Sequence, residues 1–176
     1  MKAFLSLGSN LGTRLEALKD AIVRIQSGAG FLVSCSSVYE TEPWGFKAEQ
    51  AFLNMVVEIE SSLDPEALMN ELLRIEQLMG RERVEGGYAS RLIDLDILLI
   101  DGRVFSGKVL QLPHPRMHLR NFVLVPLAEI APEIIHPLFN RTIQSILYDC
   151  PDQSSITLYM QREDVFSWLS GDKDQK

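Results

Sequence analysis

The sequence lacks several features that would assign it at once to a class of protein. Its 176 residues contain no run of about 20 apolar residues, so no transmembrane helix is predicted. The opening MKAFLSLGSN is interrupted too soon, by Gly8 and Asn10, to be a secretory signal. The P-loop pattern G-x-x-x-x-G-K-[ST] is absent as well. A cytoplasmic address is therefore expected, and any bound phosphate would be held by side chains or metal.

Cysteine and basic residues are also scarce. Cys35 and Cys150 are the two cysteines, and their spacing fits no metal site, so buried reduced thiols are expected. The 17 Lys and Arg are outnumbered by 24 Asp and Glu, which gives a net charge of −7. Nucleic-acid binding depends on accumulated positive charge. Small-molecule substrates are thus expected, with no nucleic acid, no membrane and no obligate protein partner.

What is present predicts one α+β domain. Residues 2–7, 31–41, 51–60 and 91–101 read as strands. A helix is predicted to begin at Thr13, which forms a possible capping box with Glu16. A second helix is predicted to begin at Asp64-Pro65 and to end at Gly80. Asp101-Gly102 predicts a hairpin to a strand near residues 103–105. The order is that of a ferredoxin-like βαββαβ antiparallel sheet with helices on one side, elaborated by an extra hairpin and C-terminal helices.

The C-terminal part gives weaker signals. MHLRNFVLVPLAEIAPEI, residues 117–134, reads as helical but contains Pro126 and Pro132, so two short pieces are expected. From about Pro151 no pattern is clear, and the charged end is expected to fray. Residues 1–150 are therefore assigned to the domain, and residues 151–176 to an extension that is not an independent domain.

The stretch RLIDLDILLID, residues 91–101, places two aspartates in an apolar strand. Because side chains alternate, Asp94 and Asp96 share one face, while Ile93, Leu95, Ile97 and Leu99 share the other. An ordinary D-x-D would most often be the solvated face of a sheet. Here the same segment carries Arg81, Arg83 and Arg91, and a second cationic cluster follows at His114, Arg116, His118 and Arg120. Carboxylates beside guanidinium groups are typical of a magnesium–polyphosphate site.

These residues belong to a longer series of motifs. LGSNLG, SVYETEPWG, FLNMVVEIES, RIEQLMGRER, RLIDLDILLID and LPHPRMHLRNFVLVPLAEIAPE follow one another over about residues 3–148. In this order they resemble the 6-hydroxymethyl-7,8-dihydropterin pyrophosphokinase family of folate biosynthesis. The resemblance implies transfer of diphosphate from ATP to the pterin hydroxymethyl group, release of AMP, and two Mg²⁺ ions. Because the rest of the chain is too short for a second enzyme of the pathway, the stand-alone form is expected.

The resemblance assigns the site residues one by one. It implies catalytic roles for Arg81, Arg91, Asp94 and Asp96, with the two aspartates as the metal ligands. The ATP-binding positions that it implies are Glu76, Arg83, Ile97, His114 and Arg120. The pterin-binding positions are Thr41, Pro43, Trp44, Phe52, Asn54, Tyr88 and Phe122.

Each assignment has an ordinary structural alternative. Loop arginines are commonly solvated charges, a histidine between prolines such as His114 can be structural, and Phe52 and Phe122 could be core residues. Asn54 in an apolar strand is harder to explain without a partner. The chain also departs from the family pattern, since Tyr88-Ala89-Ser90 stands where Trp-Gly-Pro is common, which bears on loop closure.

Two other functions fit the residues without the resemblance. A magnesium-dependent phosphodiesterase or nucleotidyltransferase would also use paired aspartates and arginines. A ferredoxin-like ligand-binding module would bind a small molecule without consuming ATP.

Overall fold

The computed structural model of the protein describes residues 1–42, 50–80 and 91–171. Its centre is a six-stranded sheet with the order β10-β3-β4-β1-β5, in which β2 also pairs with β4. Every pairing is antiparallel. The strands are β1 (Lys2–Ser9), β2 (Phe31–Cys35), β3 (Val38–Thr41), β4 (Phe52–Glu60), β5 (Asp94–Ile100) and β10 (Ile156–Met160). The antiparallel sheet with helices is confirmed, while the ferredoxin-like topology in the strict sense stays a prediction.

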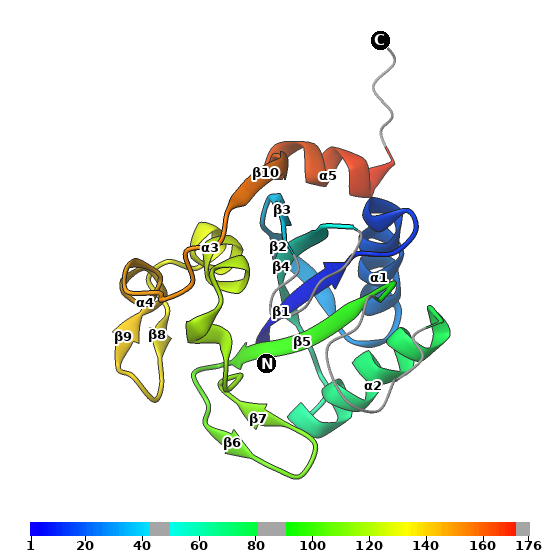
Figure 1. The fold of residues 1–176 in the computed structure, drawn as a ribbon. Helices are drawn as coiled ribbons and strands as arrows, with labels where there is room; N and C mark the ends of the chain where they lie inside the picture. The colour runs from blue at the N-terminus through cyan, green and yellow to red at the C-terminus, as the bar shows by residue number, and fades with distance from the viewer. Residues whose placement is uncertain (43–49, 81–90, 172–176) are drawn as a thin grey trace.

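Two amphipathic helices cover one face of the sheet (Figure 1) and bury a first apolar cluster, to which β1 contributes Leu5 and Leu7. In α1 (Arg14–Gly28), Leu18, Ile22 and Ile25 recur at helical spacing and are buried. In α2 (Pro65–Leu78), the Asp64 carboxylate accepts a hydrogen bond from the Ala67 N–H at 2.8 Å, and Pro65 fits the first turn. The predicted capping box of α1 is wrong, because the Thr13 side chain makes no capping hydrogen bond.

The opposite face carries C-terminal helices, which the sequence predicted as an addition to the sheet. The 3₁₀ turn η1 (Met117–Leu119), α3 (Asn121–Ile130) and α4 (Ile143–Tyr148) lie there (Figure 1). They bury Phe4, Val56, Leu98 and Leu99 in a second apolar cluster. A hairpin of β8 (Ile135–His136) and β9 (Arg141–Thr142) joins α3 to α4. The first and second clusters therefore pack against opposite faces of the sheet. The second cluster covers only part of its face.

A β-bulge in β5 corrects the predicted alternation of that strand. Phe4 of β1 lies opposite Leu99, but the next residue, Leu5, lies opposite Ile97. Leu98 is therefore the extra residue, and Leu98 and Leu99 both belong to the second cluster. Ile93, Leu95 and Ile97 remain on the first-cluster face as predicted, but Leu99 does not.

Other boundaries also differ from expectation. Residues 31–41 form two strands, β2 and β3, instead of one. Asp101 and Gly102 turn the chain with positive φ angles of 43° and 66°, as predicted. The strand that follows, β6 (Phe105–Ser106), however, pairs with β7 (Gln111–Leu112) and not with β5. The helical region is divided at Arg120, while α3 continues through Pro126.

The extension after residue 150 forms a strand and a helix within residues 156–170, although its sequence shows no clear pattern. Strand β10 pairs with β3 at the edge of the sheet, and α5 (Arg162–Ser170) follows it (Figure 1). Val165 of α5 is fully buried in the first cluster. The Arg162 guanidinium donates to Ser34 Oγ at 2.9 Å, and Lys19 Nζ donates to the Trp168 carbonyl at 2.6 Å. The extension therefore packs against β2 and α1.

Both cysteines are free and buried, as predicted. Burial raises the pKa of the Cys35 thiol to about 11, so it stays protonated at neutral pH and is a poor nucleophile.

In residues 1–42, 50–80 and 91–171, no helix has both the length and the apolar character needed to cross a membrane.

The packing of α5 against the first cluster predicts that its buried residue contributes to the free energy of unfolding. Val165→Ala removes two methyl groups from the first cluster and should lower the free energy of unfolding by about 2 kcal/mol. Urea denaturation measures the change. Glu163→Ala, an exposed position on the same helix, is the control and should be nearly neutral. An equal midpoint for Val165→Ala and the wild type would contradict the packing of α5.

Candidate active site

A pocket opens on the sheet face that α3 only partly covers. It has a volume of about 240 Å³, and its floor is formed by β1, β4 and β5. On this face the strands are apolar beneath α3 and α4, at Phe4, Val56 and Leu98, and polar where the helices end. The lining residues are Ser6, Gly8, Thr41, Glu42, Phe52, Asn54, Arg91, Asp94, Asp96, His114, Arg116, Arg120, Phe122 and Val123.

The pocket has an amide end at Asn54 and a carboxylate end at Asp94, and the register of the strands places the two ends side by side. Gly8 of β1 lies opposite Asn54 on one side and opposite Asp94 on the other. Neighbouring strands are roughly 4.8 Å apart, so Asn54 and Asp94 are about 10 Å apart with only a glycine between them. A Cβ atom at Gly8 would lie 3.0 Å from Asn54 Oδ1. Glycine therefore keeps the floor open between the amide and the carboxylate.

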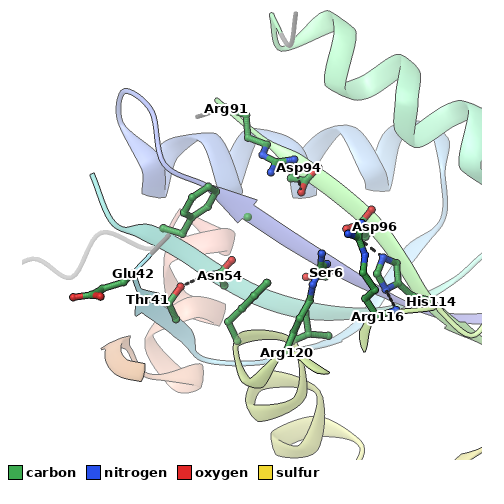
Figure 2. Close-up of a pocket in the computed structure, with 14 residues that line it drawn as sticks. Ser6, Thr41, Glu42, Asn54, Arg91, Asp94, Asp96, His114, Arg116 and Arg120 are labelled. Atoms are coloured by element: carbon green, nitrogen blue, oxygen red, sulfur yellow. Dashed lines mark hydrogen bonds and ion pairs between the residues drawn. The ribbon is translucent and has the colours of Figure 1, made fainter. Parts of the chain in front are cut away.

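The acidic end is built on β5. Asp94 and Asp96 both line the pocket, and Asp96 lies opposite Ser6 of β1 (Figure 2). Arg91 Nη1 forms an ion pair with Asp94 Oδ2 at 2.9 Å. The side chains of Asp94 and Asp96 are 25% and 37% exposed, so solvent and ligand can both reach them. The shared face predicted from the D-x-D spacing is confirmed.

Arg91 is itself held by the turn after β1. Its main-chain N–H donates to Asn10 Oδ1 at 2.7 Å, and the Asn10 N–H donates to the Arg91 carbonyl at 3.1 Å. Asn10 is fully buried. Sequence reasoning missed this role of Asn10, although an asparagine in a tight turn after a buried strand signals a side chain that bonds to main chain.

His114 lies near the acidic end of the pocket, and its hydrogen bond defines the tautomer of the neutral ring. Its Nδ1 accepts a hydrogen bond from the Arg116 N–H at 3.3 Å, so in the neutral ring the proton is on Nε2, which lies 3.9 Å from Asp96 Oδ2. Burial, followed by the positive charges of Arg120 and Arg116, lowers the pKa of His114 to about 4. His114 is therefore neutral at pH 7, and its approach to Asp96 is not an ion pair. The Nε2–H is a donor that faces the pocket.

The other end combines an amide, a hydroxyl and aromatic rings. Asn54 Nδ2 donates to Thr41 Oγ1 at 2.7 Å, and both residues are buried (Figure 2). Phe52 of β4 and Phe122 of α3 also line the pocket. The Arg120 guanidinium lies 5.6 Å from the centre of the Phe122 ring, and Arg120 is only 5% exposed. The need of Asn54 for a partner, inferred from the sequence, is confirmed.

Two predicted ATP-binding residues lie outside the pocket lining. Glu76 of α2 is buried, and its carboxylate accepts a hydrogen bond from the Leu95 N–H at 2.8 Å. The Ile97 side chain is buried in the first cluster, so any contact of Ile97 with ATP would have to come from its main chain. Neither residue is among those that line the pocket, and their roles in ATP binding stay predictions.

Five predicted site residues lie outside the described residues, namely Pro43, Trp44, Arg81, Arg83 and Tyr88.

The predicted cationic cluster is only partly at the pocket. Arg116 lines the pocket, whereas His118 packs edge-on against Phe139 with ring centres 4.9 Å apart. Sequence reasoning assigned no site role to Ser6, Gly8, Glu42 or Val123, which also line the pocket. Only the three-dimensional register places these residues around one cavity.

Comparison with known proteins identifies the family. The model of the 7,8-dihydro-6-hydroxymethylpterin-pyrophosphokinase (HPPK) family matches residues 4–132. The chain belongs to the HPPK family. A 2-amino-4-hydroxy-6-hydroxymethyldihydropteridine pyrophosphokinase of Porphyromonas gingivalis is 44% identical over 138 residues, covering 76% of this chain and 92% of that protein. The protein of the same name from Aquifex aeolicus is 37% identical over 142 residues, covering 80% and 87%.

Solved structures agree at the level of the fold. A crystal structure of wild-type Plasmodium falciparum HPPK-DHPS with SDX-DHP gives a TM-score of 0.70 at 16% identity. The similarity covers 84% of this chain but 44% of that one, so the chain spans less than half of that protein. The resemblance to the pyrophosphokinase family is confirmed, and the chain is an ATP-dependent pyrophosphokinase of folate biosynthesis. The phosphodiesterase or nucleotidyltransferase and the ligand-binding module are not supported.

The open floor at Gly8 predicts a specific defect. Gly8→Ala should push Asn54 away from its hydrogen bond with Thr41, because the added methyl group would meet Asn54 Oδ1 at 3.0 Å. We expect the KM for the pterin to rise by about tenfold. Gly8 does not need a positive φ angle, so the melting temperature should change little. Steady-state kinetics and a thermal melt measure both effects. An unchanged pterin KM would show that the floor is not a binding surface.

Proposed function

We propose that the pocket transfers an intact diphosphate from ATP to the hydroxymethyl oxygen of 6-hydroxymethyl-7,8-dihydropterin and releases AMP. The phosphates of ATP lie at the Asp94–Asp96 end, and the pterin lies at the Asn54–Phe122 end. The observation that carries this proposal is the row Asn54, Gly8, Asp94 across three paired strands. This row places an amide, which can bind a heterocycle, and a carboxylate, which can bind a metal–phosphate group, on one open floor.

Asp94 and Asp96 would hold Mg²⁺, and the family resemblance implies two ions. Within the described residues there is no group of three or more His, Cys, Asp or Glu side chains that could hold a metal by themselves. A pair of carboxylates fits Mg²⁺, which commonly takes one or two protein carboxylates and completes its octahedral shell with water and substrate phosphates. When bound, the metal neutralises charge on the phosphoryl oxygens.

The protein fixes the two carboxylates through their main chain. Pairing with β1 holds β5 on one side, and Glu76 accepts the N–H of Leu95, the residue between the aspartates. Arg91 takes one oxygen of Asp94, and Asn10 holds the Arg91 main chain. Glu76 and Asn10 therefore act as positioning residues that reduce the freedom of the ligands before ATP arrives.

Charge at the phosphate end is supplied by several groups. Arg91, Arg116 and Arg120 line the pocket as cations, and neutral His114 offers its Nε2–H as a hydrogen-bond donor to a phosphoryl oxygen. Donors that are already in place stabilise the charge of the transition state without reorganisation. The roles of Arg81 and Arg83 as further phosphate ligands stay predictions, because both residues lie outside the described chain.

The pterin end matches a flat heterocycle with an amide-like edge. Because Asn54 Nδ2 is engaged with Thr41, the Oδ1 atom, which lies on the Gly8 side, is the group that would accept an N–H of the pterin. Phe52 and Phe122 would pack against the ring faces. Pro43, Trp44 and Tyr88 would complete this end according to the resemblance.

The reaction then needs alignment more than covalent chemistry. The hydroxymethyl oxygen attacks the β-phosphorus of ATP, and the bond from that phosphorus to the α-phosphate oxygen breaks to release AMP. Holding the two substrates in line on one rigid floor provides proximity, and the arginines stabilise the charge.

The identity of the nucleotide product tests the reaction. With MgATP and 6-hydroxymethyl-7,8-dihydropterin, the protein should form AMP in a one-to-one ratio with the pterin diphosphate, separated by ion-exchange chromatography. A control without the pterin should leave ATP intact. ADP as the product would mean transfer of a single phosphoryl group, and AMP without the pterin would mean hydrolysis.

The same assay tests the metal ligands. Asp96→Ala should lower kcat by about a hundredfold or more, because charge on the phosphates is then stabilised less in the transition state. The fold should persist, since the substitution removes one of two neighbouring negative charges from a partly exposed face. Asp164→Ala, on exposed α5, is the matched control. Near-normal turnover of Asp96→Ala would sink the metal assignment.

The aromatic wall predicts a selective loss. Phe122→Ala should raise the Kd of the pterin by about tenfold while changing the Kd of ATP by less than about twofold. Fluorescence titration of the pterin and calorimetric titration of MgATP give the two constants. Phe166→Ala, an exposed aromatic on α5, serves as the control. Equal losses for both ligands would point to a structural role of Phe122 instead.

A further inference from the structure

The first residues of the C-terminal extension join two elements that line the pterin end of the pocket. Residues 152–154 contact the start of α3, and Ile156 pairs with Thr41 at the end of β3. Figure 1 shows this segment, in orange, running from the region of α3 and α4 to β10 at the edge of the sheet. The element α3 contributes Phe122 to the pocket, and β3 contributes Thr41.

Asp152 supplies a cap that α3 does not have in its own sequence. The N-cap residue of α3, Arg120, makes no capping hydrogen bond with its side chain. The Asn121 N–H instead donates to Asp152 Oδ2 at 3.1 Å, from a residue 31 positions later in the chain. The Asn121 side-chain Nδ2 donates to the Ser154 carbonyl at 2.7 Å. A carboxylate at a helix N-terminus is also favoured by the helix dipole.

Asp152 is itself fixed. Its Oδ1 accepts hydrogen bonds from the Ser154 N–H at 3.0 Å and from Ser154 Oγ at 2.6 Å. Beyond Ser154 the chain enters β10, which is hydrogen-bonded to β3, and then α5, which is anchored by buried Val165. The cap therefore connects the first turn of α3 to the sheet that carries Thr41 and Asn54.

We infer that Asp152 is a positioning residue for pterin binding. By holding Asn121, it sets the neighbouring residue Phe122 relative to the Thr41–Asn54 pair across the pocket. This inference rests on the proposed pterin-side role of Phe122. It gives the extension a role in the reaction, although the HPPK family model ends at residue 132.

The test compares steady-state AMP formation by the full-length variants. Asp152→Ala should raise the KM for the pterin by about fivefold, a size typical of a lost helix cap, while kcat and the KM for ATP change by less than about twofold. Asp152→Asn keeps one acceptor oxygen and should recover part of the loss. Asp149→Ala, whose ion pair is with exposed Arg141 and not with α3, is the matched control and should change neither KM.

A double-mutant cycle separates positioning from general stability. If Asp152 acts through Phe122, Asp152→Ala should raise the pterin KM by less than about twofold in a Phe122→Ala background. Independent effects that multiply would overturn the inference, as would an equal rise of both KM values or no rise at all. If Asp152→Ala does not fold, Asp152→Asn carries the comparison, and its expected rise of about twofold should disappear in the Phe122→Ala background.

The outcomes also distinguish the inference from the function on which it rests. A selective pterin defect in Phe122→Ala with wild-type kinetics in both Asp152 variants would overturn the positioning role alone. An unchanged pterin KM in Phe122→Ala would overturn the assignment of the pterin end, and the role of Asp152 with it.

Discussion

The antiparallel pairing of β4, β1 and β5 is the constraint on which the site depends. Because the three strands are hydrogen-bonded in one register, Asn54, Gly8 and Asp94 form a row whose spacing the backbone determines. A slip of one residue in either pairing would turn the amide or the carboxylates toward the core. The packing that stabilises the fold therefore also fixes the distance between the amide end and the carboxylate end of the pocket. Glycine in the middle of the row keeps that distance free of side chains.

The same face of the sheet serves both as part of the core and as the floor of the pocket. Where α3 and α4 lie on it, its residues are apolar and buried, and where those helices end, its residues are polar and line the cavity. The bulge at Leu98 helps this division, because it turns two consecutive leucines toward α3 just beyond the aspartates. Helix α3 thus has two functions, since its body closes the second cluster and its first turn brings Phe122 to the cavity.

Local patterns in the sequence predicted much of this arrangement. The D-x-D spacing gave a shared face for Asp94 and Asp96, and the isolated polar Asn54 in an apolar strand indicated a partner that proved to be Thr41. What failed depended on contacts distant in sequence. The bulge at Leu98, which no local pattern shows, moves Leu99 from the predicted face to the second cluster. The tail looked patternless because its strand is short, is mostly exposed and becomes a strand only by pairing with β3. Gly8 and Asn10 were visible in the sequence, but their roles follow from what lies opposite them.

The central claim is that Asp94 and Asp96 hold the metal ions that contact the ATP phosphates, while the pterin lies beyond Gly8. A crystal structure of the protein with Mn²⁺, a non-hydrolysable ATP analogue and 6-hydroxymethyl-7,8-dihydropterin tests it most directly, because the anomalous signal of Mn²⁺ locates the metal without interpretation. The account predicts anomalous peaks within about 2.2 Å of carboxylate oxygens of both aspartates and of the analogue phosphates, with the pterin ring beside Asn54 and Phe122. Peaks bound only by phosphates or by other side chains, or a pterin elsewhere, would contradict it.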